Sequence, residues 1–382
     1  MDFTLTEEQK MLKTMAQDFA VKELEPMAAK TDEESRYPAE GVKKMAELGF
    51  LGIGFPEELG GSGGGAMELS IVTEEICKVC ASTGAVLLAS TGLAGHPLYV
   101  FGNEEQRKRI VSRVAKGEIM AAFGLTEAGA GSDPAGMETT ATRTKGGYII
   151  NGTKIFITNG AEAGVVLVFA TVDKSLKHRG ITAFIVESVT PGYSVGKHEH
   201  KLGIRGSSTT ELIFDNCFVP EENRVGKEGE GFKIALEAID ASRITVAAQA
   251  VGIAQGALDK ALAYAKERQQ FGQPIINFQA IQWMLADMAT RIDAARLLTL
   301  RAAYLEDHGQ SFVRESAMAK VFAAETAMAA TTKAIQIYGG YGYVKEYPIE
   351  RYFRDAKITE IYEGTSEMQR MTIARQLMKQ IS

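Results

Sequence analysis

Three glutamates lie close together near the C-terminus, in "RDAKITEIYEGTSEMQR", residues 354–370. Glu360, Glu363 and Glu367 are separated by three and four residues, a spacing that places side chains on one face of a helix. The Gly-Thr-Ser sequence after Glu363 does not suit the middle of a surface helix, because glycine weakens helices and Ser and Thr favour caps. The segment therefore either holds a carboxylate that acts as a base or is a charged turn without a chemical role.

A glycine-rich stretch, "AAFGLTEAGAGSDPAGM", offers a second kind of chemistry. Its four glycines, together with Thr126 and Ser132, would let backbone N–H groups and hydroxyls approach a ligand closely. Such groups can hold a phosphate or the polar edge of a ring. A tight loop without a ligand is the alternative.

Two further segments contain residues suited to phosphates. In "KERQQFGQPIINFQAIQ", Arg268 follows an expected helix that Phe271-Gly272 breaks, and arginine is the best bidentate phosphate ligand. A solvated arginine at a helix end is the alternative. In "AIQIYGGYGYVKEYP", glycines alternate with tyrosines, as expected where a backbone approaches something flat or phosphorylated.

The cysteines do not indicate a metal or redox site. Cys77 and Cys80 form a CxxC pair, but no second ligand pair and no βαβ context accompany them. We expect both to be small buried residues on a helix, in a protein of a reducing compartment.

Composition bounds the class of protein. The chain has 382 residues, so two or three domains are expected, and it is 45% apolar and 24% charged, as is usual for soluble proteins. Its net charge of −6 argues against nucleic-acid binding. No apolar run reaches the ~18–20 residues of a membrane span, and the acidic N-terminus resembles no targeting segment. A bacterial-type cytoplasmic location is expected.

The texture of the sequence predicts three domains that would position these residues. Residues 1–117 read as helices, beginning with a capping box at Thr6 and Gln9. Residues 118–225 contain short Val-, Ile-, Phe- and Thr-rich runs typical of an antiparallel β domain, with a hairpin turn expected at Asn151-Gly152. Residues 226–382 return to the helical period, and two apolar stripes mark buried helix faces: Ile281, Leu285, Met288 and Ile292, and Val251, Leu258 and Leu262. The predicted fold class is α+β and multidomain.

Six motifs together resemble the acyl-CoA dehydrogenase family, most closely its short-chain, butyryl-CoA-type members. They are "GLTEAGAGSD", "KIFITNG", "KLGIRGSSTTELIFDNCFVP", "ERQQFGQPI", "QIYGGYGY" and "RDAKITEIYEGTSE", and the resemblance covers essentially the whole chain. It implies an N-terminal helical domain, a middle β domain, a C-terminal four-helix bundle and a homotetramer. It also implies FAD, bound between the β domain and the C-terminal helices and reaching a neighbouring subunit.

The resemblance assigns roles to individual residues. Expected FAD contacts are Phe123, Leu125, Thr126, Ser132, Phe156, Ile157, Thr158, Arg268, Phe271, Gln279, Gln336, Gly339, Gly340, Thr365 and Glu367. Expected acyl-CoA contacts are Ser132, Asp240, Arg243 and Gly364. No metal is expected.

Glu363 matches the catalytic base of the family. The implied reaction removes a proton from Cα and passes a hydride from Cβ to flavin N5, and a base for such a weak acid needs a raised proton affinity, which burial supplies. Some relatives carry the base beside the position of Arg243, but here that neighbour is Ser242, which cannot serve. Electrons are expected to pass to electron-transferring flavoprotein.

Substrate and direction stay open. The segment "LLASTGLAGHPLYVFG" (87–102) matches the acyl end of the pocket and is rich in small residues, which suits either a branched or alicyclic acyl group or a linear short chain. An enoyl-CoA reductase, an acyl-CoA oxidase and a non-catalytic scaffold are the alternative functions.

Overall fold

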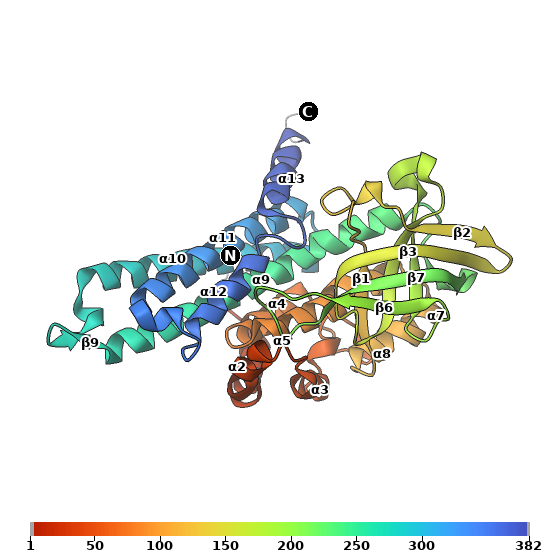
Figure 1. Cartoon of the computed structure of the whole chain (residues 1–382). Helices are drawn as coiled ribbons and strands as arrows, with labels where there is room; N and C mark the ends of the chain where they lie inside the picture. Colours follow the sequence, from red (N-terminus) through yellow and green to blue (C-terminus); the bar gives the residue numbers. More distant parts are fainter. Residues whose placement is uncertain (1–3, 380–382) are drawn as a thin grey trace.

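The computed structural model describes residues 4–379, which form a helical region, a sheet and a second helical region in chain order (Figure 1). The first helices are α1 (Glu7–Phe19), α2 (Glu25–Glu33), α3 (Ala39–Glu47), α4 (Ala66–Cys77), α5 (Ala81–Leu87), α6 (His96–Phe101), α7 (Glu104–Gln106) and α8 (Ser112–Ala115). The strands of the sheet are β1 (Met120–Gly124), β2 (Thr140–Thr144), β3 (Gly147–Thr158), β4 (Ala163–Thr171), β5 (Ile181–Glu187), β6 (Tyr193–His198), β7 (Thr209–Pro220) and β8 (Arg224–Val225). The last part comprises α9 (Gly231–Glu267), the short strands β9 (Gln269–Gln270) and β10 (Gln273–Pro274), α10 (Gln279–Asp307), α11 (Val313–Tyr338), α12 (Ile349–Ile358) and α13 (Ser366–Lys379).

The first helix begins at the predicted capping box. Thr6 Oγ1 accepts a hydrogen bond from the Gln9 amide at 3.2 Å, and the Thr6 amide donates to Gln9 Oε1 at 3.1 Å. The two contacts satisfy donors that a helix N-terminus leaves unpaired. The buried side of α1, including Phe19, packs into a core with Met45 and Phe50.

The sheet has eight strands in the order β6-β7-β3-β2-β4-β5-β8, with β1 paired to β4. Most neighbouring strands are antiparallel, as predicted, but β1 runs parallel to β4. A parallel pair needs a long connection, and here β2 and β3 lie within the connection between β1 and β4. The α+β fold class is thus confirmed, and the sheet is mixed rather than purely antiparallel.

The hairpin expected at Asn151-Gly152 is wrong. Both residues lie inside β3, where the pairing of β3 with β7 shifts register, and the Asn151 side chain accepts a hydrogen bond from the Asn216 amide at 2.7 Å. A Cβ on Gly152 would lie 2.4 Å from Thr139 Oγ1, so the glycine permits a close approach at a bulge. The turn between β2 and β3 instead contains Gly146, with φ of 83°.

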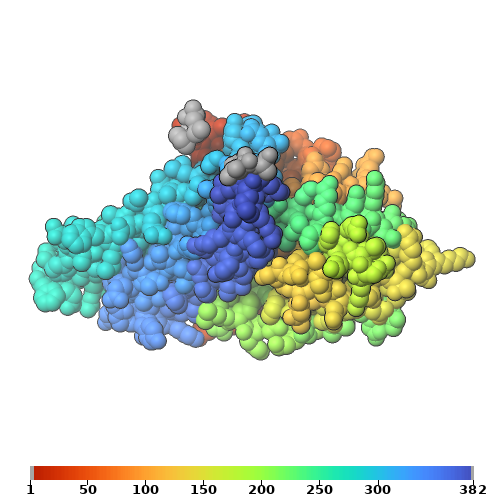
Figure 2. All heavy atoms as spheres, turned by 90° about the horizontal axis from the view of Figure 1, so that it is seen from above, coloured from red at the N-terminus to blue at the C-terminus, as the bar shows by residue number. Residues whose placement is uncertain are grey.

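The C-terminal helices form a bundle built on α9, α10 and α11. The predicted stripe on α10 is confirmed, since Leu285, Met288 and Ile292 are buried in the same core as Val251 and Leu258 of α9. Helices α12 and α13 pack against α11. In Figure 2, α13 (dark blue) lies between the bundle and the yellow and green β domain, so the turn that precedes it is placed at their junction.

One described helical stretch, Ala81–Phe101, is long and apolar enough to cross a membrane, contrary to the expectation from apolar runs. Because 72% of its most apolar window is buried inside the fold, it has the character of a core helix. Cys77 and Cys80 are both buried and free, as expected of small core residues.

Candidate active site

Glu363 lies in a turn with an unusual backbone conformation. It follows α12 and precedes α13, and its φ is 53°, a value that a residue with a side chain rarely adopts. Gly364 follows with φ of 90°, which glycine adopts easily. Three hydrogen bonds hold the two carbonyls: Gln369 Nε2 donates to Glu363 O at 3.0 Å and to Gly364 O at 2.8 Å, and Lys320 Nζ donates to Gly364 O at 2.7 Å.

The carboxyl group of Glu363 points to α9. Ser242 Oγ donates a hydrogen bond to Glu363 Oε2 at 2.9 Å, so the residue that neighbours Arg243 touches the expected base directly. Burial raises the pKa of Glu363, and Ser242, Lys320 and Arg243 oppose the shift in that order. Desolvation dominates, so the carboxylate is a stronger base than an exposed glutamate.

The same turn carries unpaired backbone donors. The amide N–H groups of Glu363 and Gly364 donate to no other residue among 4–379, although the neighbouring Tyr362 and Ser366 amides are both bonded. Donors of this kind at a base can stabilise negative charge on a substrate oxygen.

The expected acyl-CoA contacts meet this turn from α9. Arg243 and Asp240 form an ion pair one helical turn apart, and Arg243 is buried. Arg243 Nη2 lies 3.9 Å from the position that a Cβ on Gly364 would take. The buried Arg243 Nε has no hydrogen-bond partner within the described part of the chain. Ser132 lies in an exposed loop and has no hydrogen bond to these residues.

The β domain presents one exposed aromatic side chain among the expected flavin contacts. Phe156 is 59% exposed and has φ of 57° at an irregularity of β3, whereas Ile157 beside it is buried. Thr126 and Thr158 are half-buried. The side chains of Phe123 and Leu125 are buried in the core, so a cofactor would contact the backbone groups of these residues.

A buried ion pair that the sequence analysis missed fixes the loop after β1. Lys154 is fully buried, and its Nζ lies 2.7 Å from Glu127 Oε1 and donates to Leu125 O at 3.0 Å. Glu127 also accepts from the Thr139 amide at 3.0 Å. Burial lowers the pKa of Lys154 to about 8, with the Glu127 carboxylate opposing the shift. The lysine inside the motif "KIFITNG" could have signalled this pair.

A second group of expected cofactor contacts surrounds a pocket of about 460 Å³ at the end of the bundle. Arg268, Gly339 and Gly340 line it, and the Arg268 guanidinium lies 5.4 Å from the centre of the Tyr341 ring. No atom lies within 4 Å of a Cβ built on either glycine, and Gly339 has φ of 61°. Phe271, Gln279 and Gln336 are exposed nearby and do not line the pocket.

The last two expected FAD contacts lie at the start of α13. Thr365 Oγ1 accepts a hydrogen bond from the Met368 amide at 3.3 Å, as a helix cap does, and Glu367 is exposed. Glu360 instead pairs with Lys357 on α12 at 2.5 Å. The three glutamates of the segment therefore have different surroundings.

The two groups of expected cofactor residues lie in distant parts of the molecule. Figure 1 places β9, beside Arg268, at the far end of the bundle from the sheet that carries Phe156, and Figure 2 agrees. The first group offers an exposed aromatic face, hydroxyls and open space at Gly129 and Gly131, which fits a planar ring with a polar edge. The second offers a guanidinium and bare backbone, which fits phosphates. The residues present therefore fit FAD.

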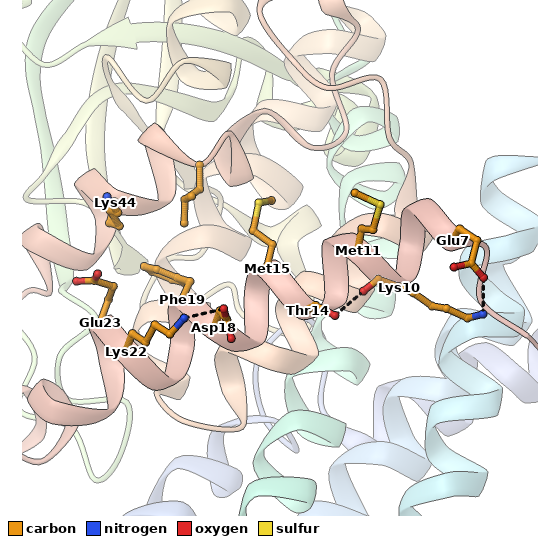
Figure 3. Close-up of a pocket in the computed structure, with 11 residues that line it drawn as sticks. Glu7, Lys10, Met11, Thr14, Met15, Asp18, Phe19, Lys22, Glu23 and Lys44 are labelled. Carbon is orange, nitrogen blue, oxygen red and sulfur yellow. Dashed lines mark hydrogen bonds and ion pairs between the residues drawn. The ribbon is translucent and has the colours of Figure 1, made fainter.

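A groove of about 600 Å³ lies elsewhere, beside α1 (Figure 3). Met11, Met15 and Phe19 line it, and Lys22 pairs with Asp18 at its edge at 2.7 Å. None of the expected site residues lines this groove.

Comparison with known proteins identifies the class. Three domain models of the acyl-CoA dehydrogenase family match the chain: the N-terminal domain at residues 6–118, the middle domain at 122–217 and the C-terminal domain at 229–378. The chain belongs to the acyl-CoA dehydrogenase family and is an FAD-dependent oxidoreductase. The expected family, fold class and cofactor are confirmed.

Its relatives include short-chain enzymes. The chain is 49% identical over 379 residues to the short-chain specific acyl-CoA dehydrogenase of Clostridium acetobutylicum, covering 99% of this chain and 100% of the relative. It is 52% identical over 381 residues to acryloyl-CoA reductase (NADH) of Anaerotignum propionicum, covering 99% and 96%.

Two solved structures have nearly the same fold. Butyryl-CoA dehydrogenase from Megasphaera elsdenii has a TM-score of 0.97 at 45% identity, covering 99% of this chain and 100% of that one. A chain in a structure described as the electron transferring flavoprotein of Acidaminococcus fermentans has a TM-score of 0.98 at 51% identity, with the same coverage.

Proposed function

We propose that the protein converts a short-chain acyl-CoA to the 2-enoyl-CoA, with Glu363 removing the Cα proton. The observation that carries this proposal is the Glu363 carboxyl group, which burial makes more basic and which Ser242 holds at 2.9 Å. A positioned general base of this kind contributes on the order of 10²–10⁴-fold to a reaction rate.

The amides of the turn would stabilise the charge that develops in the substrate. As the Cα proton leaves, the thioester oxygen gains negative charge, and the unpaired N–H groups of Glu363 and Gly364 are suited to bind it. Gly364 has no side chain to obstruct the thioester. Arg243 and Asp240 would hold the CoA portion, and the unpaired Arg243 Nε supports a ligand there. Ser132 is a further proposed contact.

FAD supplies the hydride acceptor for the Cβ hydrogen when it is bound. We assign its binding to the residues that the resemblance implied, with Phe156, Thr126 and Thr158 on the flavin side and Arg268 with Gly339 and Gly340 on the phosphate side. The separation of these groups within one chain supports a site that two subunits share, as would occur in the proposed homotetramer.

Electron-transferring flavoprotein is the proposed electron acceptor. The support is a solved structure whose description names the electron transferring flavoprotein of Acidaminococcus fermentans. That structure contains a chain 51% identical to this one. Relatives from Clostridium acetobutylicum and Bacillus subtilis support a bacterial-type cytoplasmic enzyme.

The acyl group is proposed to be short, with room for branching. The π-helical segment Leu88–Gly95 is buried beside α9, and a Cβ on Gly92 would lie 3.6 Å from Thr245 Oγ1. The Thr91 hydroxyl donates a hydrogen bond to Leu51 O, and the Ser90 hydroxyl accepts one from the Ala121 amide, so both are engaged with the backbone. Small apolar surroundings suit a short linear, branched or alicyclic group.

The reverse reaction is the second candidate, because acryloyl-CoA reductase (NADH) of Anaerotignum propionicum is 52% identical to this chain. The same base would then return a proton to Cα as a general acid. The test compares two rates: reduction of acryloyl-CoA or crotonyl-CoA by the chemically reduced enzyme, and oxidation of the matching saturated thioester with an electron acceptor present. A faster reduction would favour the reverse direction.

The test of the proposed function is an anaerobic titration of the FAD-loaded protein with butyryl-, isobutyryl-, hexanoyl- and cyclohexanecarbonyl-CoA. Loss of the visible flavin absorbance with at least one short-chain thioester supports the proposal. A clean preference for butyryl-CoA would reject the branched and alicyclic groups, and absence of bleaching with the whole panel would reject the reaction.

A further inference from the structure

Lys320 is a buried lysine for which neither the motifs nor the proposed reaction gives a role. It lies on α11 and is 0% exposed, on a helix face where Ala319, Ala323 and Ala327 are also buried. A lysine is almost never fully buried without a partner, because desolvation disfavours its charge. The surroundings of the Lys320 ammonium must therefore compensate for its lost hydration.

The contacts of Lys320 lead to the turn of the base. Its Nζ donates to Gly364 O at 2.7 Å, and no carboxylate lies within ion-pair distance of it in the described part of the chain. The carbonyl that it binds belongs to the residue directly after Glu363, in a turn where both residues have positive φ. The ammonium thus helps to hold a backbone conformation that glutamate does not favour by itself.

The charge of Lys320 also acts on Glu363. Burial lowers the pKa of Lys320 to about 8, and the Glu363 carboxylate is the first charge that opposes this shift. Conversely, Lys320 lowers the pKa of Glu363 against the larger effect of burial. Lys320 on α11 and Arg243 on α9 are the charges that act on Glu363, and Glu363 in turn acts on Tyr362 beside it. One step further out, Asp240 acts on Arg243, and Glu360 and Glu367 act on Lys320. Cys77 and Asp355 act on Tyr362.

We propose that Lys320 is a positioning residue of the active site, which fixes the Glu363-Gly364 turn through the Gly364 carbonyl and keeps the Glu363 carboxylate available as a base by its buried charge. Without the cation, only Ser242 and Arg243 would oppose the effect of burial, and the protonated, inactive carboxyl group would persist to a higher pH. This inference deepens the proposed function and rests on Glu363 as the base.

The test compares FAD-loaded wild-type protein with Lys320→Met, which keeps the length of the side chain and removes its charge and donors. The readout is the pH titration of the Glu363 carboxyl stretching band in infrared difference spectra, identified as the band that Glu363→Gln lacks. Lys320→Met should raise the midpoint by about one pH unit, a tenfold higher proton affinity. The acid limb of the rate of flavin reduction by butyryl-CoA should move by the same amount.

Lys333→Met is the matched control. Lys333 lies on the same helix, about 20 Å from Lys320 along the helix axis, and pairs with Asp287. This variant removes the same charge and should leave the midpoint of the Glu363 band unchanged. Lys320→Gln is the second variant if Lys320→Met does not fold, and it should also raise the midpoint.

A merely structural lysine would give a different result. Variants of Lys320 would then lower thermal stability, or lower the rate of flavin reduction equally at all pH values, and the Glu363 band would keep its wild-type midpoint. This result would overturn the proposal. The infrared band is measured without substrate, so it tests the role of Lys320 independently of the reaction. If the flavin of Glu363→Gln were reduced at the wild-type rate, the proposed function would be rejected, but the band would still decide whether Lys320 acts on Glu363.

Discussion

The surroundings of Glu363 separate it from the other acids of its segment. Glu360 has a lysine partner and Glu367 is exposed, whereas the Glu363 carboxyl group accepts a hydrogen bond from Ser242 and is desolvated. Burial and a single hydroxyl donor leave its pKa raised, while an exposed carboxylate would remain a weak base. At the scale of single residues, the proposed chemistry thus depends on the surroundings of the Glu363 carboxyl group.

Ser242→Ala tests this balance. The Ser242 hydrogen bond lowers the pKa of Glu363, so its loss should raise that pKa further. The base would then be protonated up to a higher pH, and the acid limb of kcat/KM for butyryl-CoA should move upward, with the rate restored at alkaline pH. Thr299→Ala, which removes a buried hydroxyl bonded within α10, should not move the limb. An unmoved limb in Ser242→Ala would contradict this balance.

Sequence motifs could predict the type and position of the proposed base but not its environment. The spacing of the three glutamates leaves them equivalent, and the resemblance to a family selects Glu363. The buried lysines were missed, because motif comparison directs attention to ligand contacts and not to what holds the loops. The helical spacing does contain a signal for the burial of Lys320. Lys320 lies four residues after Ser316 and three before Ala323, on the buried face of α11.

At the scale of elements, a buried aspartate joins the β domain to the C-terminal helices. Asp355 on α12 is 5% exposed, and its Oδ1 accepts a hydrogen bond from the amide of Ile204, in the loop between β6 and β7, at 2.5 Å. Arg354 beside it pairs with Asp32 of α2 at 2.6 Å. The helix that leads to the Glu363 turn is therefore anchored to two other parts of the chain.

Asp355→Asn should change the pH dependence of stability. Burial raises the pKa of Asp355 from 3.8 to about 6, so between these values the folded state binds more protons than the unfolded state. The free energy of unfolding should therefore fall as the pH rises from about 4 to about 6, by on the order of 2–3 kcal/mol from this group. Asparagine can accept the Ile204 hydrogen bond without a charge, and the variant should lack this part of the slope.

Denaturant unfolding between pH 4.5 and 7 measures the effect. The wild-type protein should lose stability relative to Asp355→Asn as the pH rises through this range. Asp293→Asn serves as the control, because Asp293 is an exposed partner of Arg296, and it should keep the wild-type slope. Parallel profiles for wild-type protein and Asp355→Asn would contradict the raised pKa.

Local patterns predicted the elements better than their connections. The capping box and the apolar stripes of α9 and α10 are confirmed because they depend on neighbours in sequence. Asn151-Gly152 has the residues of a hairpin turn, yet the contact of Gly152 with Thr139 and the pairing of β3 with β7 place it inside a strand. The parallel pairing of β1 has no local signal, because pairing partners distant in sequence decide it. The exact limits of the three domains remain a prediction.

At the scale of the whole molecule, the separation of the two groups of proposed cofactor residues is the main constraint on how FAD would bind. A single chain carries the flavin-side group by the sheet and the phosphate-side group at the far end of the bundle (Figure 1). The proposed homotetramer, in which each FAD would touch two chains, accounts for both groups. Its mass in solution should be about four times the 41.3 kDa of one chain.

Subunit complementation tests the shared site. Arg268→Ala should weaken FAD binding and Glu363→Gln should slow flavin reduction by about 10²-fold or more, so each variant alone should have little activity. When the two are co-expressed, some sites combine the intact Glu363 of one chain with the intact Arg268 of another, and activity should return to a fraction of the wild-type value. If the two groups instead belonged to one site within one chain, the mixture would stay inactive.

The most direct measurement of the central claim is the anaerobic reaction of FAD-loaded Glu363→Gln with butyryl-CoA, followed by the visible flavin absorbance in a stopped-flow instrument. Glutamine keeps the shape of the side chain and cannot take the Cα proton, so butyryl-CoA should still bind while the rate of bleaching falls by about 10²–10⁴-fold or more. Bleaching of Glu363→Gln at the wild-type rate would contradict the assignment of Glu363 as the base.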